Sequence, residues 1–107
     1  MIYRFKVQNK GVNASQKHHL GNSSYRHGQY AEAIKHYNSA IKTNPTSVLY
    51  GNRAACYFKL KQFRSALEDY ERAEKQNPTN GTFILFSKLL YILKLKLYLG
   101  KLILLND

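Results

Sequence analysis

The chain has 107 residues, which fits one small domain and leaves too little for a second. Its 17 Lys and Arg outnumber its 6 Asp and Glu, and the formal charge of +11 disfavours basic partners and favours acidic ones. Hydrophobic residues make up 44% of the chain, which excludes a disordered tail and is enough to form a core.

Residues 1–13 are predicted to be an N-terminal extension that precedes the first helix. The segment contains Arg4, Lys6 and Lys10 and lacks an apolar run of the length that a secretory signal needs, so export is not expected. The single cysteine, Cys56, cannot form an internal disulfide. Nothing in the sequence therefore indicates an oxidising compartment, and the expected location is cytoplasmic.

Two stretches of the chain match each other at a spacing of 33 residues. The segment 28–45 aligns with 61–78, and the upstream segment 18–26 aligns more weakly with 51–59. The clearest pairs are Tyr30 with Phe63, Ala33 with Ala66, Tyr37 with Tyr70, Ala40 with Ala73, Asn44 with Asn77 and Pro45 with Pro78. A repeat of this length is typical of arrays built from one small supersecondary unit.

Each repeat is predicted to be a helical hairpin. In the second half of the first repeat, large and small apolar residues recur at steps of three and four, which places them on one stripe of a helix. They are Tyr30, Ala33, Ile34, Tyr37, Ala40 and Ile41. Asn-Pro at 44–45 and at 77–78 ends a helix, because proline lacks an amide donor and restricts the residue before it. We expect helices at about 14–27, 30–43, 47–60 and 63–76, with Gly28 breaking the chain between the first two.

This pattern resembles the tetratricopeptide repeat (TPR) family, whose helix-turn-helix unit of about 34 residues carries Leu-Gly, Ala-x3-aromatic and a closing Pro. The first unit, 14–45, and the second, 47–78, supply the later half of that signature in register. The resemblance implies an all-α fold of tandem helix-turn-helix hairpins in a short right-handed superhelix, with an apolar C-terminal helix. The departures are Lys17, Ser24, Arg53 and Ala54, and they predict looser helix packing.

The segment 81–107 does not continue the repeat, and three interpretations of it stay open. It is a terminal helix that caps the second unit, a membrane anchor, or a truncated third repeat. Between Phe83 and Leu105 it holds 15 Leu, Ile and Phe together with four lysines. The cost of inserting central lysines into lipid nearly cancels the apolar gain, which disfavours the membrane. As a cap, the segment is expected to dock through Leu89, Leu90, Ile92 and Leu93.

The sequence contains no pattern that supports catalysis. It has no nucleophile elbow and no phosphate-binding glycine loop, and Glu32 is the only acidic residue before position 68. The four histidines lack metal-ligand spacing, and Cys56 is predicted to be a buried, unreactive thiol. No enzyme activity, cofactor, metal or small-molecule substrate is therefore predicted.

The first helices of the two repeats carry the most informative residues. Many TPR co-chaperones bind the acidic C-terminal tail of heat-shock chaperones through a Lys and an Asn in the first helix, an Asn in the third, and a Lys and an Arg in the fifth. The resemblance places Asn22 and Asn52 at the two asparagines and His18 at the first lysine. The two basic positions of the fifth helix fall on Thr82 and Phe86, so that half of the anion site is missing unless Lys88 replaces it.

The predicted function is that of a protein-protein adaptor whose groove binds an acidic peptide or a chaperone C-terminus. The predicted peptide-binding residues are His18, Asn22, Tyr25, Arg26, Asn52 and Lys59. An alternative is an incomplete TPR fragment that assembles with a larger partner. Residues 1–67 hold 11 Lys and Arg against one acid, which leaves nucleic acid as a disfavoured alternative because no base-reading element accompanies the charge.

Overall fold

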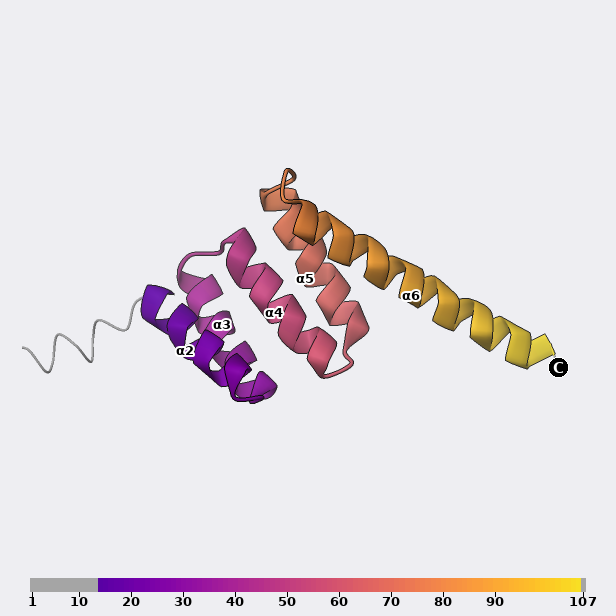
Figure 1. The fold of residues 1–107 in the computed structure, drawn as a ribbon, viewed down its shortest axis with the longest axis horizontal. Helices are drawn as coiled ribbons and strands as arrows, with labels where there is room; N and C mark the ends of the chain where they lie inside the picture. The colour runs from indigo at the N-terminus through magenta and orange to yellow at the C-terminus, as the bar shows by residue number, and fades with distance from the viewer. Residues whose placement is uncertain (1–13, 107) are drawn as a thin grey trace, which may run out of the picture.

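The computed structural model describes residues 14–106, and the predicted N-terminal extension lies outside this range. The described part of the chain is a series of five helices without a strand (Figure 1). They are α2 (Ala14–Arg26), α3 (Tyr30–Thr43), α4 (Ser47–Lys59), α5 (Phe63–Gln76) and α6 (Gly81–Asn106). The predicted all-α fold is confirmed, and the four helices expected from the repeat begin and end within one residue of the expected positions.

Short polar residues and two left-handed backbone positions set the helix ends. Thr46 caps α4 by accepting a hydrogen bond from the Leu49 amide at 3.2 Å, and Asn80 caps α6 by accepting from the amides of Thr82 and Phe83. Between α2 and α3 the chain turns at Gly28 with φ 75°, and the equivalent residue between α4 and α5, Lys61, has φ 61°.

The small residues of the repeat let neighbouring helices approach closely. In the first hairpin the side chains of Ala33, Tyr37 and Ala40 are buried against Leu49 and Cys56 of α4. A methyl group added at Gly21 would lie 2.5 Å from the Tyr37 ring, so α2 and α3 touch where the side chain is absent. The Ala-x3-Tyr spacing therefore packs as predicted, with a small residue one turn from a large ring.

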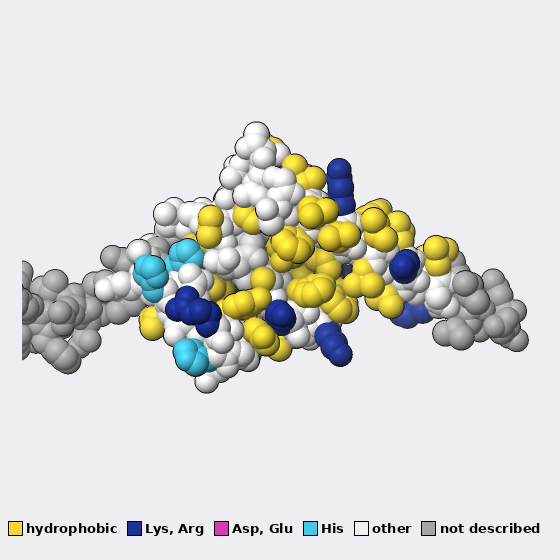
Figure 2. Space-filling model, viewed as in Figure 1, with side chains coloured by type: hydrophobic (Ala, Val, Ile, Leu, Met, Phe, Trp, Pro, Cys, Tyr) yellow, Lys and Arg dark blue, Asp and Glu magenta, His cyan; other side chains and the backbone are white. Residues whose placement is uncertain are grey.

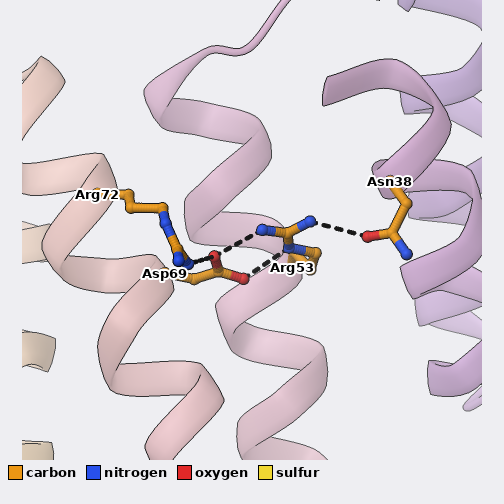
Figure 3. Close-up of polar contacts among 4 residues, drawn as sticks. All are labelled: Asn38, Arg53, Asp69 and Arg72. Atoms are coloured by element: carbon orange, nitrogen blue, oxygen red, sulfur yellow. Dashed lines mark hydrogen bonds and ion pairs between the residues drawn. The ribbon is translucent and has the colours of Figure 1, made fainter. Parts of the chain in front are cut away.

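A buried ion pair joins three helices at the centre of the molecule (Figure 3). The guanidinium of Arg53 on α4 donates to both oxygens of Asp69 on α5, at 2.7 and 2.8 Å, and to Asn38 on α3 at 2.8 Å. Arg72 donates to the same carboxylate at 2.8 Å, and the Asp69 side chain is fully buried. The expectation of looser packing at Arg53 is wrong, because this arginine holds the two neighbouring helices through charged hydrogen bonds.

The first half of α6 completes the core of the second hairpin. Phe83 and Leu90 are buried with Leu67 and Tyr70 of α5, and Leu93 packs against them in part. The expected docking set is correct for Leu90 and Leu93. It is wrong for Leu89 and Ile92, which are 51% and 53% exposed, because the stripe that faces α5 runs through Phe83, Ser87 and Leu90.

The C-terminal end of α6 projects past the other helices (Figure 1). Between Leu93 and that end, Lys94, Leu97, Tyr98 and Lys101 still line a hollow with the first turns of α5. Apolar and lysine residues alternate over 93–97, and this run is helical. Leu95 and Leu97 of the run and the following Tyr98 are exposed. Within 14–106, no helix combines the length and the apolar character needed to cross a membrane. The interpretations of the segment 81–107 as a native cap and as a truncated third repeat both stay predictions.

Candidate functional site

A hollow of about 290 Å³ lies between α2 and α4 and brings together most of the predicted binding residues. Its lining consists of Asn22, Tyr25, Arg26, Tyr37, Asn52 and Ala55. Four of these were predicted from the sequence. His18 and Lys59, the other two predicted residues, are not among the lining residues, and neither is Lys17.

The two asparagines meet at the centre of the hollow, and protein hydrogen bonds fix their amides. The Tyr37 hydroxyl donates to Asn22 Oδ1, and the same oxygen accepts from Asn52 Nδ2 at 3.4 Å. Burial raises the pKa of Tyr37, so its hydroxyl stays protonated and able to donate. Asn22 makes both contacts through its oxygen. Its Nδ2 has no partner among the described residues and can therefore donate to an anion.

His18 extends this network at its N-terminal side. Its Nε2 lies 3.0 Å from Asn52 Nδ2, an arrangement in which the ring nitrogen accepts and the imidazole is neutral. Burial, with a further contribution from the neighbouring His19, lowers the pKa of His18 below its ordinary value of 6.5. Near pH 7 the residue therefore orients Asn52 and supplies no positive charge.

The remaining predicted residues differ in how close they lie to the hollow. Arg26 is exposed at the end of α2 and lines the hollow, so it is the cation within reach of a bound anion. Tyr25 lines it beside Arg26 and packs edge-on against Tyr30, with ring centroids 5.3 Å apart. Lys59 is exposed, does not line the hollow, and lies one helical turn beyond Ala55 on α4.

The fifth helix in chain order, α6, has no charged residue at the two positions that carry basic residues in the family pattern. Thr82 is exposed, and the ring of Phe86 stacks on Tyr70 with centroids 5.2 Å apart. Lys88 does not replace the missing charge, because it lines a different hollow with Glu71 and Glu74 of α5. Arg26 of α2 is therefore the one cation among the described residues that line the hollow.

Tyr37 is the site residue that the sequence did not indicate as functional. It was assigned to the core, and its ring is indeed 1% exposed. The available signal was the hydroxyl itself, because the family pattern has Phe at this position and a buried phenol needs a hydrogen-bond partner. The partner it finds, Asn22, is a predicted binding residue.

The described residues contain no group of three or more His, Cys, Asp or Glu that could hold a metal ion. Cys56 is buried, as predicted, and burial raises the pKa of its thiol to about 11. A thiol with this pKa is protonated near neutral pH and is a poor nucleophile.

Comparison with known proteins gives matches along most of the described chain. The family models described as tetratricopeptide repeat match residues 14–47 and 47–80. The Hsp70-Hsp90 organizing protein of Triticum aestivum is 43% identical over 67 residues, which cover 62% of this chain and 12% of that protein. This chain thus spans about one eighth of the relative's length.

Two solved structures have similar folds. The Arabidopsis OM64 TPR domain has a TM-score of 0.72 at 26% identity, covering 78% of this chain and 69% of that one. The second TPR of Spaghetti (RPAP3), bound to the HSP90 peptide SRMEEVD, has a TM-score of 0.71 at 26% identity. That match covers 89% of this chain and 83% of the solved one.

Proposed function

Because the chain belongs to the tetratricopeptide repeat family, we propose that it is a non-enzymatic adaptor that binds the C-terminal carboxylate of an acidic peptide. The binding site is the hollow between α2 and α4. Asn22 donates to the carboxylate through its Nδ2. Asn52, whose Nδ2 already donates to His18 and to Asn22, offers its Oδ1 to the N–H of the last peptide group, and Arg26 supplies charge at the edge. The partner class is a protein whose C-terminus resembles that of the heat-shock chaperones.

The observation that carries this proposal is the fixed orientation of the two asparagine amides. An anion with two oxygens needs donors that are already aligned, because ordering side chains on binding costs free energy. Tyr37 holds the Asn22 oxygen, and His18 accepts from Asn52. The network therefore keeps the Asn22 amide nitrogen available at the surface of the hollow.

The charge distribution over this part of the molecule supports an anionic ligand. Figure 2 shows His side chains together with basic side chains over α2, and further Lys and Arg side chains spread among hydrophobic ones over α4 and α6. No acidic side chain of the described residues is visible on that face. The formal charge of the chain is +11. An acidic peptide would be attracted to such a surface, and the attraction would weaken as salt screens it.

The test is a titration of the full chain with the peptide SRMEEVD, followed by fluorescence anisotropy, against the same peptide with a C-terminal amide. We expect weak binding of the acid that falls with salt, and weaker binding of the amide. Asn22→Ala or Asn52→Ala should reduce affinity by about tenfold, because a hydrogen bond to a charged group contributes about 1.5–3 kcal/mol.

Gln76→Ala is the matched control, because it removes an exposed amide at the end of α5 away from the hollow. It should leave the affinity unchanged. If SRMEEVD does not bind at low ionic strength, or if Asn52→Ala binds as well as the parent chain, the proposed function is wrong.

The exposed apolar residues of α6 favour a second function, in which the chain assembles with a larger protein. Leu95, Leu97, Tyr98 and Leu99 are all more than two-fifths exposed on one projecting helix. Exposed apolar surface of this extent is typical of interaction sites. The test is light scattering after chromatography, alone and with candidate partners. A chain that stays monomeric and captures none of them contradicts this second function.

A further inference from the structure

Two further hollows follow one another along the contact between α5 and α6, which lie side by side (Figure 1). The first has a volume of about 360 Å³ and is lined by Glu71, Glu74, Ser87, Lys88, Tyr91 and Ile92. The second has a volume of about 300 Å³, and its lining includes Arg64, Leu67, Lys94, Leu97, Tyr98 and Lys101. Neither hollow is lined by a residue of α4, so both lie apart from the peptide site.

The helical period joins these two hollows into one trough. On α5 their lining residues recur at steps of three and four, which places them on one stripe: Arg64, Leu67, Glu71 and Glu74. On α6 the same steps give a second stripe: Ser87, Tyr91, Lys94, Tyr98 and Lys101. From Ser87 to Lys101 the helix rises about 21 Å, or nearly four turns. The two stripes form what we call the α5–α6 trough.

The two ends of the α5–α6 trough carry opposite charge. Glu71 and Glu74 line one end with a single cation, Lys88. Three cations and no acid line the other end, and they are Arg64, Lys94 and Lys101. Among the described residues the ion pairs join Glu32 to Lys35 and Asp69 to two arginines, so none involves a charge of the trough. The charges at both ends are therefore available to a partner.

Between its charged ends the α5–α6 trough exposes apolar side chains. Tyr91, Leu97 and Tyr98 are 52%, 55% and 60% exposed. Leu67 and Leu90 line the same surface and belong to the buried core, so the floor of the trough is fixed. Apolar side chains gathered on one exposed face are typical of interaction sites, because covering them removes apolar area from water.

The charges of the chain favour a second copy as the occupant of this trough. Four of the six acidic residues lie on α5, and the formal charge of the chain is +11. Two copies therefore repel each other unless the basic surface of one meets the acids of the other. When two troughs lie antiparallel, the basic end of each faces the acidic end of the other. A two-fold interface requires this self-complementarity, because the same surface is used by both copies.

We propose that the α5–α6 trough is the interface of a two-fold symmetric dimer of this chain. Helices α5 and α6 of one copy pack antiparallel on α5 and α6 of the other. Lys94 and Lys101 of each copy then meet Glu71 and Glu74 of its partner, and the exposed tyrosines are covered between these contacts. This inference gives a specific partner to the second function proposed above, assembly through α6. It does not depend on the peptide site between α2 and α4.

The first measurement is the molar mass of the full chain by light scattering after chromatography, over a range of concentrations. We expect the mass to rise from that of one chain to that of two, because the charge of +11 on each copy keeps the association weak. A helix of another protein as the natural occupant would instead leave the chain monomeric by itself. A chain that is monomeric at every concentration therefore overturns the inference, although the second function could still hold with that occupant.

Two charge variants test how the copies are arranged. Lys94→Glu with Lys101→Glu adds acids to the basic end of the trough, and Glu71→Lys with Glu74→Lys removes the acids from the other end. In each variant, like charges face one another across the interface, so the dissociation constant of the dimer should rise by about tenfold or more. Mixing equal amounts of the two variants should restore the dimer, because every altered end then faces an altered end of opposite charge.

Lys35→Glu with Lys42→Glu is the matched control. It changes the net charge by the same amount at two exposed lysines that are seven residues apart on α3, as Lys94 and Lys101 are on α6. It should form dimers as the parent does, and circular dichroism should confirm that all the variants are folded. If this control weakens the dimer as much as the α6 variant does, the effect comes from net charge and the inference is overturned.

The mixture separates the antiparallel arrangement from any other dimer. If the two charge variants are folded and their mixture stays monomeric, the basic and acidic ends do not meet and the inference is overturned. Titration of the same variants with SRMEEVD keeps the two sites distinct, since none of the changed residues lines the hollow between α2 and α4. Failure of the peptide to bind would contradict the carboxylate site and leave the dimer standing.

Discussion

Leu20 and Arg53 occupy the same position of the two hairpins, 33 residues apart, and meet different surroundings. Leu20 lies on the first described helix and is 46% exposed. Arg53 lies on α4 between α3 and α5, where its side chain is 17% exposed and its hydrogen-bond partners are Asp69 and Asn38. A charged residue is accommodated at this position of the repeat because helices on both sides supply acceptors for it.

The largest expected effect comes from removing the helix that flanks the second hairpin. Deleting 81–107 uncovers the face that Phe83 and Leu90 bury, and at about 1.5–3 kcal/mol for each large side chain the free energy of unfolding should fall by about 4 kcal/mol. Thermal unfolding followed by circular dichroism, together with dye binding to exposed apolar surface, measures this loss.

A shorter deletion, 96–107, is the control, because it keeps the docked half of α6. It should unfold at nearly the same temperature as the full chain. If the chain without 81–107 is equally helical, more soluble and no less stable, α6 is not part of the fold. The interpretation of α6 as a cap is then wrong.

Breaking the ion pair of the second hairpin should have the next largest effect. Asp69→Ala leaves Arg53 without its carboxylate, and removing one partner of a buried pair costs about 3 kcal/mol. The equivalent change in the first hairpin, His36→Ala, should cost less than about 0.5 kcal/mol, because His36 is partly exposed and makes no such pair. Urea unfolding compares the two.

The double variant Arg53→Leu with Asp69→Leu sharpens this result. It replaces both charges by apolar groups and should recover much of the lost stability, because a well-packed apolar pair is often as stable as a buried ion pair. If Asp69→Ala and His36→Ala are equally mild, the Arg53 network contributes little to stability.

The turns of the two hairpins differ by one residue whose effect should be smaller. Lys61 adopts the left-handed conformation that Gly28 adopts in the first hairpin. Because this conformation costs an L-residue about 1 kcal/mol or more, Lys61→Gly should raise the free energy of unfolding by about 1 kcal/mol and Gly28→Lys should lower it by a similar amount. Changes of the same sign in both variants would contradict this explanation.

The smallest effect concerns His18, which belongs to the first hairpin alone. Folding lowers its pKa below 6.5, so its contribution to stability is complete above about pH 6.5 and is lost as the pH falls through the lowered value. A bound carboxylate favours the protonated ring, so peptide affinity should rise about threefold as the pH falls below 6.5. Because its pKa is lowered, the rise should come at a lower pH than an ordinary histidine would give.

His18→Lys should bind the peptide more tightly and with little pH dependence, because it supplies the charge at every pH. His36→Lys adds the same charge on α3 and serves as the control. Titrations between pH 5.5 and 8 decide the matter. If His18→Lys binds no better than the parent and both are independent of pH, His18 lies outside the anion site.

The helices of the two hairpins could be predicted because several local signals agreed. The Asn-Pro pairs, Gly28 and the apolar stripe all placed the ends of α3 and α5 where the structure has them. The docking face of α6 could not be predicted in the same way. Of the 26 residues of α6, 17 are Leu, Ile, Tyr or Phe, and they are spread all around the helix. The apolar pattern therefore marks no single face, and only contact with α5 selects Phe83, Ser87 and Leu90.

The sequence predicted most residues of the candidate site but not the hydrogen bonds that join them. Resemblance to the family placed Asn22 and Asn52, but the Tyr37 hydroxyl and the His18 nitrogen that orient them depend on contacts between different helices. Asp69 shows a signal that was missed. It lies three residues from Ala66 and four from Ala73 on the buried stripe of α5, where an acid needs a cation such as the unusual Arg53.

The bond from Arg53 to Asn38 has a consequence for how the chain unfolds. In a linear array of repeats, the free energy of each interface decides whether neighbouring units open separately or together. Arg53 joins α3 of one hairpin to α5 of the next through a single guanidinium, so opening either hairpin breaks hydrogen bonds that belong to both. Amide protons of α3 and α5 should therefore exchange with solvent at a common rate, as members of one cooperative unit.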